Sequence, residues 1–117
     1  MANEISVSLS LRYSNSPTSA SLAASFLADQ VGSKYESGIQ TVGTAEENLA
    51  KNDVGTIGYI AVRNTDPDNY VELASSTGVY SVKLRAGESC FIPWEGAQVI
   101  AKANTAACDV EYMIIEL

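Results

Sequence analysis

The side chains that carry out most acid–base and metal chemistry are missing or badly spaced in this chain. It has no histidine, which excludes serine–histidine triads, imidazole acid–base catalysis and histidine-ligated metal sites. Its two cysteines, Cys90 and Cys108, lack the Cys-x-x-Cys spacing of a zinc site. We interpret them as small buried hydrophobic residues, with a cross-strand disulfide as the alternative.

Acidic residues provide two further candidates. Residues 66–69, Asp-Pro-Asp-Asn, put two carboxylates and an amide in one loop, but the other oxygen ligands of a calcium loop are missing, and the pattern is typical of a plain turn. Glu46 and Glu47 adjoin, yet an acid–base pair needs one carboxyl in an apolar pocket, so we expect these and Glu95 to be solvated. We therefore predict no catalytic residue, no metal ligand, no cofactor and no enzymatic activity.

Aromatic residues offer binding surfaces instead. Trp94, the single tryptophan, follows an expected strand; it is either a lid over the end of the core or an anchor in a protein interface. Tyr59, Tyr70 and Tyr80 recur on consecutive expected strands. They indicate a cross-strand aromatic row, used for packing or as a ligand platform.

Charge and hydropathy exclude two classes of partner. With 14 acidic and 7 basic residues, the net charge is -7, which repels nucleic acid and anionic membranes. No apolar run approaches the ~20 residues of a membrane helix, and the first residues lack the features of a signal peptide. We expect synthesis in the cytoplasm and no nucleic-acid or membrane partner.

The N-terminal third alternates with a period of two. Residues 4–13 place Ile5, Val7 and Leu9 on one side and serines on the other, which predicts a half-buried strand. Residues 14–19 are polar and predict a loop, and alternation resumes over residues 22–30. Short, irregular strands are expected between residues 35 and 42.

Apolar runs alternate with turn clusters over the rest of the chain. The expected strands are residues 59–64, 70–74, 79–84, 89–93, 98–103 and 108–117. The last becomes apolar on both faces near its end, which predicts burial on both sides. About eight or nine short strands in 117 residues favour an all-β, two-sheet antiparallel sandwich, jelly-roll-like, as one domain over residues 1–117.

One segment gives conflicting indications. Thr44 with Glu47 three residues later is a capping-box pattern, typical of a helix start. Residues 44–51 span only two helical turns among strands, so one helical turn and a bent strand are both open.

Several of these segments also resemble a known group of proteins. The chain resembles small virion structural proteins of tailed bacteriophages, of the capsid decoration (cement) kind. The segments that carry the resemblance are 39–44 with 46–47, 58–64, 69–72, 84–88 and 101–104.

We predict a non-enzymatic capsid decoration protein that binds and stabilises the head shell, with the major capsid protein or other virion proteins as partners. The resemblance itself implies a virion structural protein of the head shell, the tail or the neck. It implies location in the virion, and we expect a homo-oligomer. A tail- or neck-associated structural module, or one binding a receptor or carbohydrate, is the alternative. As interface residues we predict Ile5, Val7 and Leu9 on the N-terminal strand and, separately, Trp94.

Overall fold

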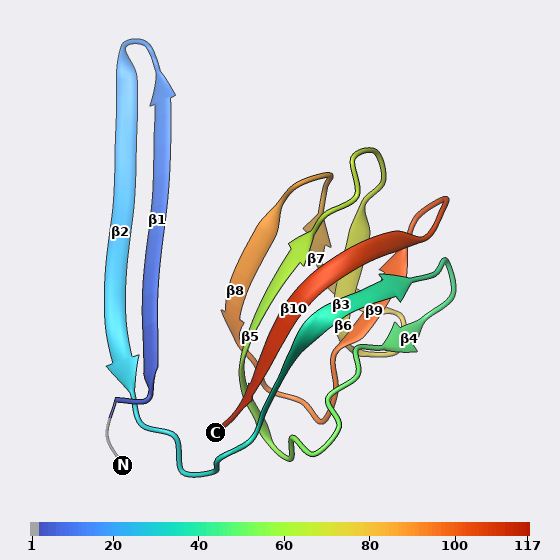
Figure 1. Ribbon diagram of the computed structural model, residues 1–117. Coiled ribbons are helices and arrows are strands. Elements are labelled where there is room, and N and C mark those ends of the chain that lie inside the picture. Colours follow the sequence, from blue (N-terminus) through green and yellow to red (C-terminus); the bar gives the residue numbers. More distant parts are fainter. Residues whose placement is uncertain (1–2) are drawn as a thin grey trace. The chain divides into compact units, whose positions relative to one another are not determined.

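A computed structural model describes residues 3–117, which form ten strands and no helix (Figure 1). The all-β class and the antiparallel two-sheet sandwich are confirmed, with ten strands where the sequence predicts eight or nine. The chain divides into two compact units, Met1–Val31 and Gly32–Leu117, where the sequence predicts a single domain. We call residues 3–31 the arm and residues 32–117 the body.

The arm is one long hairpin of two strands, β1 (Ile5–Asn15) and β2 (Thr18–Ala28). Apolar residues alternating with small polar ones favour an extended chain with two different faces. The strands pair without a register shift along their whole length. Ser16 and Pro17, joined by a cis peptide bond, are the only residues between them.

The polar loop predicted over residues 14–19 is therefore wrong at both ends. Ser14 pairs with Ser19, and Asn15 pairs with Thr18, inside the ladder. All four residues are exposed. Their polar side chains are therefore solvated on either face of the hairpin, and their polarity does not prevent strand formation. The ladder satisfies their backbone groups, which an open loop would leave to solvent.

The body is a sandwich of two four-stranded antiparallel sheets. The first sheet has the order β3-β10-β5-β8 and the second the order β4-β9-β6-β7. The strands of the first sheet are β3 (Tyr35–Val42), β10 (Cys108–Glu116), β5 (Ile57–Asn64) and β8 (Ser89–Pro93). Those of the second are β4 (Glu47–Asn48), β9 (Ile100–Ala103), β6 (Val71–Ser76) and β7 (Val79–Leu84).

The core of the body lies between the inner faces of the two sheets. On β10 the residues Val110, Tyr112 and Ile114 are buried, while Glu111 and Met113 between them are exposed. The same period of two operates on β5. The cluster is completed by Val42, Leu49, Val54, Ile57, Ile60, Val62, Val71, Leu73, Leu84, Val99, Ala101, Ala103 and Cys108.

Asn64, at the end of β5, is the one fully buried polar residue among residues 3–117. Its Nδ2 donates to the carbonyl oxygens of Asn69 (2.8 Å) and Leu84 (3.0 Å), and its Oδ1 accepts from the amide of Asp66 (3.0 Å). Because each polar atom of the side chain has a partner, its burial is tolerated. Asn64 thus joins β5 to the turn that follows it and to the end of β7.

The strand alternative applies to residues 44–51. Glu47 and Asn48 form β4 against β9, and no helical turn is present in this segment. The Glu47 carboxylate accepts from the amide of Gly43 (3.0 Å) and from Gln40 Nε2 (2.9 Å). A capping-box glutamate instead serves the first turn of a helix, and here burial of Leu49 in the core overrides that local preference.

Two other predictions about strands are wrong. Residues 35–42 form one continuous strand, β3, paired along β10, rather than short irregular pieces. The end of the last strand is not buried on both sides: Met113 is 42% exposed and Leu117 is 49% exposed. Apolar residues on both faces of a strand do not by themselves show that each face is buried, because burial needs a second layer over that face.

Candidate interaction site

The arm carries an apolar face that runs its full length. The register places Val7 opposite Phe26, Leu9 opposite Ala24 and Leu11 opposite Leu22. Directly opposite residues share a face in an antiparallel pair. The complete rows of this face are Ile5/Ala28, Val7/Phe26, Leu9/Ala24, Leu11/Leu22 and Tyr13/Ala20. We call it the apolar arm face.

The opposite face of the arm is mostly hydroxyl-bearing. It holds Ser6, Ser8, Ser10 and Arg12 on β1, opposite Leu27, Ser25, Ala23 and Ser21 on β2. Leu27 is its one large apolar residue and is 60% exposed. Serine side chains are readily hydrated, so this face suits contact with water.

Three rows of the apolar arm face are open to solvent. Leu9 is 43% exposed, Leu11 70%, Tyr13 53% and Leu22 71%. Single exposed apolar residues are ordinary on protein surfaces, but a contiguous row of them marks an interaction surface. A two-stranded hairpin is also marginally stable alone in water. These rows are therefore the strongest candidate for a site on this protein.

The predicted interface residues occupy different environments. Ile5 and Val7 are buried, at 5% and 8% exposure, whereas Leu9 begins the exposed rows. Trp94 is half-buried and packs against the core cluster, and its Nε1 donates to the carbonyl of Gln98 (3.1 Å). That environment fits the lid interpretation of Trp94, while its use as an interface anchor stays a prediction.

The prediction of interface residues stopped short of the most exposed ones. Leu11 and Tyr13 continue the alternation of Leu9, and Leu22 stands on the next alternating segment. Recognising that two alternating segments joined by a short turn make one hairpin would have brought these residues together. The polar residues 14–19 predict a longer loop, so the two-residue turn at Ser16 and Pro17 was not expected.

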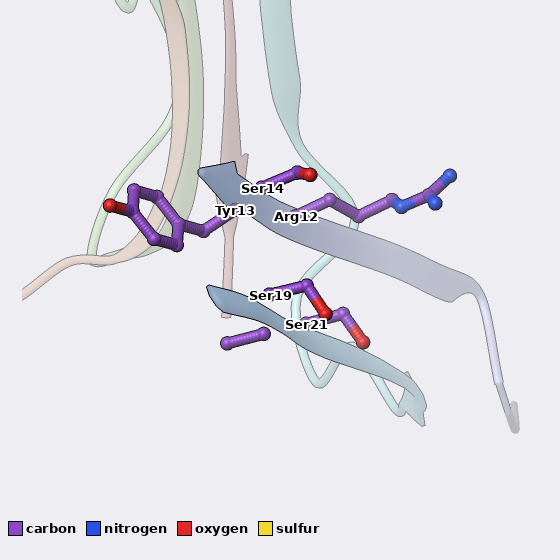
Figure 2. Close-up of a pocket in the computed structure, with 6 residues that line it drawn as sticks. Arg12, Tyr13, Ser14, Ser19 and Ser21 are labelled. Atoms are coloured by element: carbon purple, nitrogen blue, oxygen red, sulfur yellow. The ribbon is translucent and has the colours of Figure 1, made fainter. Parts of the chain in front are cut away.

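A shallow open hollow lies at the tip of the arm, lined by Arg12, Tyr13, Ser14, Ser19, Ala20 and Ser21. Figure 2 shows Tyr13 and Arg12 pointing to opposite sides of β1. The hollow thus draws on both faces of a two-stranded sheet and does not enclose a small molecule. The one charged residue that lines it with the serines is Arg12, and a guanidinium stays protonated and does not act as a general base.

The outer face of the second sheet is charged and hydrogen-bonded. Lys83 Nζ lies 4.1 Å from the ring centre of Tyr70, and Lys102 Nζ lies 5.1 Å from that of Tyr80. The Tyr80 hydroxyl donates to Glu46. Burial, together with this hydrogen bond, raises the pKa of Tyr80 to about 12, and the same bond lowers the pKa of Glu46. These contacts satisfy surface groups and gather no acid–base pair around a cavity.

The expected tyrosine row is divided between the two sheets. Tyr59, on β5 of the first sheet, stacks on Phe91 with ring centres 5.6 Å apart. Tyr70 and Tyr80 belong with the second sheet and pack under lysines. No single platform of three tyrosines exists, although packing on the sheet faces, the first of the two interpretations, describes each of them.

The remaining candidates for chemistry have structural roles. Asp66 Oδ2 accepts from the amides of Asn69 (2.6 Å) and Asp68 (2.9 Å), which closes the predicted turn and lowers the pKa of Asp66. Cys90 and Cys108 are both free thiols, and burial raises the pKa of each. A raised thiol pKa disfavours the reactive thiolate.

Residues 3–117 lack two further kinds of feature. No group of three or more histidine, cysteine, aspartate or glutamate side chains is placed to hold a metal ion in this part of the chain. Nor does the described part contain a helix of the length and apolar character that crossing a membrane requires.

No protein-family model, curated protein or solved structure matches this chain.

Proposed function

We propose that this protein is a non-enzymatic structural component of a tailed-phage virion, a capsid decoration protein that binds and stabilises the head shell. The observation that carries the proposal is the exposed apolar arm face. Leu9, Leu11, Tyr13 and Leu22 present apolar surface on an element that has no second layer of its own. Such a surface serves contacts between proteins better than it serves catalysis.

The body supports the same proposal. Its polar core residue, Asn64, is fully hydrogen-bonded, and the Asp66 carboxylate closes a turn. The orders β3-β10-β5-β8 and β4-β9-β6-β7 support a jelly-roll connectivity, an architecture used by viral capsid domains and by lectins. Because one fold hosts many functions, the assignment to a virion depends on the resemblance of segments 39–47, 58–64, 69–72, 84–88 and 101–104.

A decoration protein acts by binding the assembled shell more tightly than its separated parts. Binding of that kind stabilises the assembled state by mass action. The apolar arm face would supply contact with a neighbouring protein on the shell, and no residue needs to turn over a substrate. Partners are thus the major capsid protein or a neighbouring virion protein.

Purified protein added to phage heads that lack it tests this proposal. We expect saturable co-sedimentation with heads, at a fixed ratio to the capsid protein, and a higher temperature of head disruption. Free capsid subunits serve as the control, since a decoration protein favours the assembled lattice. Absence of binding to heads, with binding to tails or cells instead, overturns the assignment to the shell.

A receptor- or carbohydrate-binding module is the second candidate, because of the arm tip. Tyr13 is 53% exposed, and its hydroxyl accepts from Nδ2 of Asn15 (3.2 Å) on the same face. An exposed ring with a polar neighbour suits a sugar. Glycan or host-cell binding that Tyr13→Ala removes and Tyr35→Ala leaves intact supports this function. Tyr35 is a matched control, because it is an exposed tyrosine of the body.

A further inference from the structure

We propose that the arm is a self-association element: the apolar arm faces of two copies pack against each other around a two-fold axis parallel to the strands. This inference concerns the arm alone and does not require the protein to belong to a virion. It rests on three features of the arm, namely what is exposed, what charge it carries and how large and small residues are arranged.

Exposure limits the contact to the distal rows. Ile5 and Val7 are already buried, although Phe26 opposite Val7 is 37% exposed. The rows that are open on β1 are therefore Leu9/Ala24, Leu11/Leu22 and Tyr13/Ala20. Another apolar layer over these six residues would bury them between two hairpins. The arm would then have the packing partner that a two-stranded hairpin needs for stability in water. The serine face would stay in water.

The charge of the arm identifies the chemistry of the occupant. Between Ile5 and Ala28 the one charged residue is Arg12, and it lies on the serine face. The apolar arm face therefore offers no ion pair to a nucleic acid or to an anionic lipid. Its occupant must be an uncharged apolar surface of similar width.

The body discourages a membrane as that occupant. Residues 1–31 hold one basic and two acidic residues, so residues 32–117 hold 7 - 1 = 6 basic and 14 - 2 = 12 acidic residues, a net charge of -6. Most biological membrane surfaces are negative, and they repel a body of this charge. A second copy of the arm carries no such penalty at the contact itself.

The pattern of side-chain sizes makes the face complementary to itself. On β1 the three exposed positions are large, Leu9, Leu11 and Tyr13, whereas on β2 alanines stand at positions 24 and 20. The face is thus a ridge along β1 beside a lower track along β2, interrupted by Leu22. Cores pack best where large residues meet small ones.

A two-fold axis parallel to the strands matches ridge to track. It places β1 of one copy opposite β2 of the other, so that Leu9 meets Ala24 of the second copy and Tyr13 meets its Ala20. Leu11 meets Leu22 in the middle row. An axis across the strands would set β1 against β1, large against large, and would leave the alanines facing a gap. Self-complementarity of this kind is what an isologous interface requires.

The geometry also predicts how tight the pair is. Three rows form a small contact, so we expect a dissociation constant on the order of micromolar. Parallel arms bring two bodies of net charge -6 to the same end of the pair, and their repulsion is screened by salt. Association should therefore strengthen as salt concentration rises.

Sedimentation velocity of the full chain over a range of concentrations and salt tests the pair. We expect a concentration-dependent dimer that Leu11→Ser with Leu22→Ser weakens at least tenfold. Leu27→Ser is the matched control, because Leu27 is a leucine on the serine face that is 60% exposed, against 70% for Leu11 and 71% for Leu22. That variant should dimerise like the parent. Trp94 fluorescence melts establish that each variant keeps a folded body.

Cross-linking tests the direction of the axis. In a background with Cys90 and Cys108 replaced by alanine, we expect a short bis-maleimide to join a Leu9→Cys chain to an Ala24→Cys chain efficiently. We expect it to join a Leu9→Cys chain to a Tyr13→Cys chain poorly, because only an axis across the strands through the middle row would set Leu9 opposite Tyr13.

Three outcomes overturn the proposal. The first is a monomer at all concentrations, and the second is a dimer indifferent to Leu11→Ser with Leu22→Ser. The third is efficient linking of Leu9→Cys to Tyr13→Cys, which would mean that the axis runs across the strands. A monomer that binds phage heads through the apolar arm face would leave the proposed function standing while removing self-association.

Discussion

The arm and the body have the same local sequence pattern but differ in how much of their apolar surface is buried. β1 of the arm and β10 of the body both alternate apolar and polar residues over a long strand. In β10 the apolar side is covered by a second sheet, so Val110 and Ile114 are fully buried. In β1 the same side leaves Leu11 70% exposed. Alternation makes a strand amphipathic, but burial of its apolar side needs a second layer.

Because of this difference in burial, we expect the body to determine the stability of the fold and the arm to provide the binding surface. The body buries a continuous cluster between two sheets and can hold its fold by itself. The arm has a single layer and gains most from being covered. Equivalent substitutions in the two units should therefore have unequal effects.

The largest expected effect is on the core of the body. Leu73→Ala removes a side chain with no exposed surface on β6 and should lower the free energy of unfolding by about 2–5 kcal/mol. The matched change in the arm, Leu22→Ala, removes a side chain that is 71% exposed. Measured by urea unfolding of the dilute protein, it should alter stability by less than about 0.5 kcal/mol. Equal losses in the two variants would contradict the contrast drawn here.

The next effect comes from the buried asparagine. Asn64→Ala leaves the carbonyls of Asn69 and Leu84 without their side-chain donor inside the body and should cost about 1–3 kcal/mol. Thermal or urea unfolding measures the loss. Asn15→Ala, at the exposed tip of the arm, is the control and should be close to neutral. A loss of stability in Asn15→Ala but not in Asn64→Ala would contradict the expectation that the body determines stability.

A smaller effect should appear in acid. Glu116 Oε2 accepts from the amide of Gly55 (2.7 Å), and Oε1 accepts from that of Ser33 (3.3 Å); these bonds lower the pKa of Glu116. A lowered folded pKa means that the stabilisation is present above the unfolded value, near 4.5, and is lost as pH falls through the folded value.

Melting curves between pH 7 and pH 3 test this. Glu116→Gln should melt lower than the parent at pH 7, and the difference should shrink toward pH 3. Glu95→Gln controls for the loss of one negative charge. A difference that is constant with pH would mean that the Glu116 carboxylate is not responsible.

The smallest effect should appear in alkali. Because burial and the bond to Glu46 raise the pKa of Tyr80 to about 12, its contribution is complete below the unfolded value, near 10, and is lost as pH rises toward 12. Tyr80→Phe should remove the latest-titrating phenol from the absorbance titration at alkaline pH and slightly reduce stability at pH 7. Tyr35→Phe is the control. Loss of an early-titrating phenol in Tyr80→Phe would contradict the assignment.

The sequence predicts the elements of the body well, because strand periodicity and turn residues are local properties. The strands expected at residues 79–84 and 89–93 have those bounds in the structure, and Asp66 closes the expected turn through its own side chain. For the site, alternation identified the row that begins with Ile5, Val7 and Leu9. The polar residues 14–19 predict a loop, whereas in the structure Ser14 and Asn15 pair with Ser19 and Thr18 and so continue the hairpin.

What the sequence by itself determined is thus the all-β class, most strand positions and the apolar character of one side of residues 5–13. Only the tertiary structure decided which apolar sides are covered. It buried Leu49 beside residues that resemble a helix start, left Met113 and Leu117 exposed at the end of the last strand, and left Leu11 and Leu22 open on the arm. The physical reason is that periodicity depends on neighbours along the chain, whereas burial depends on a second layer that is distant in sequence.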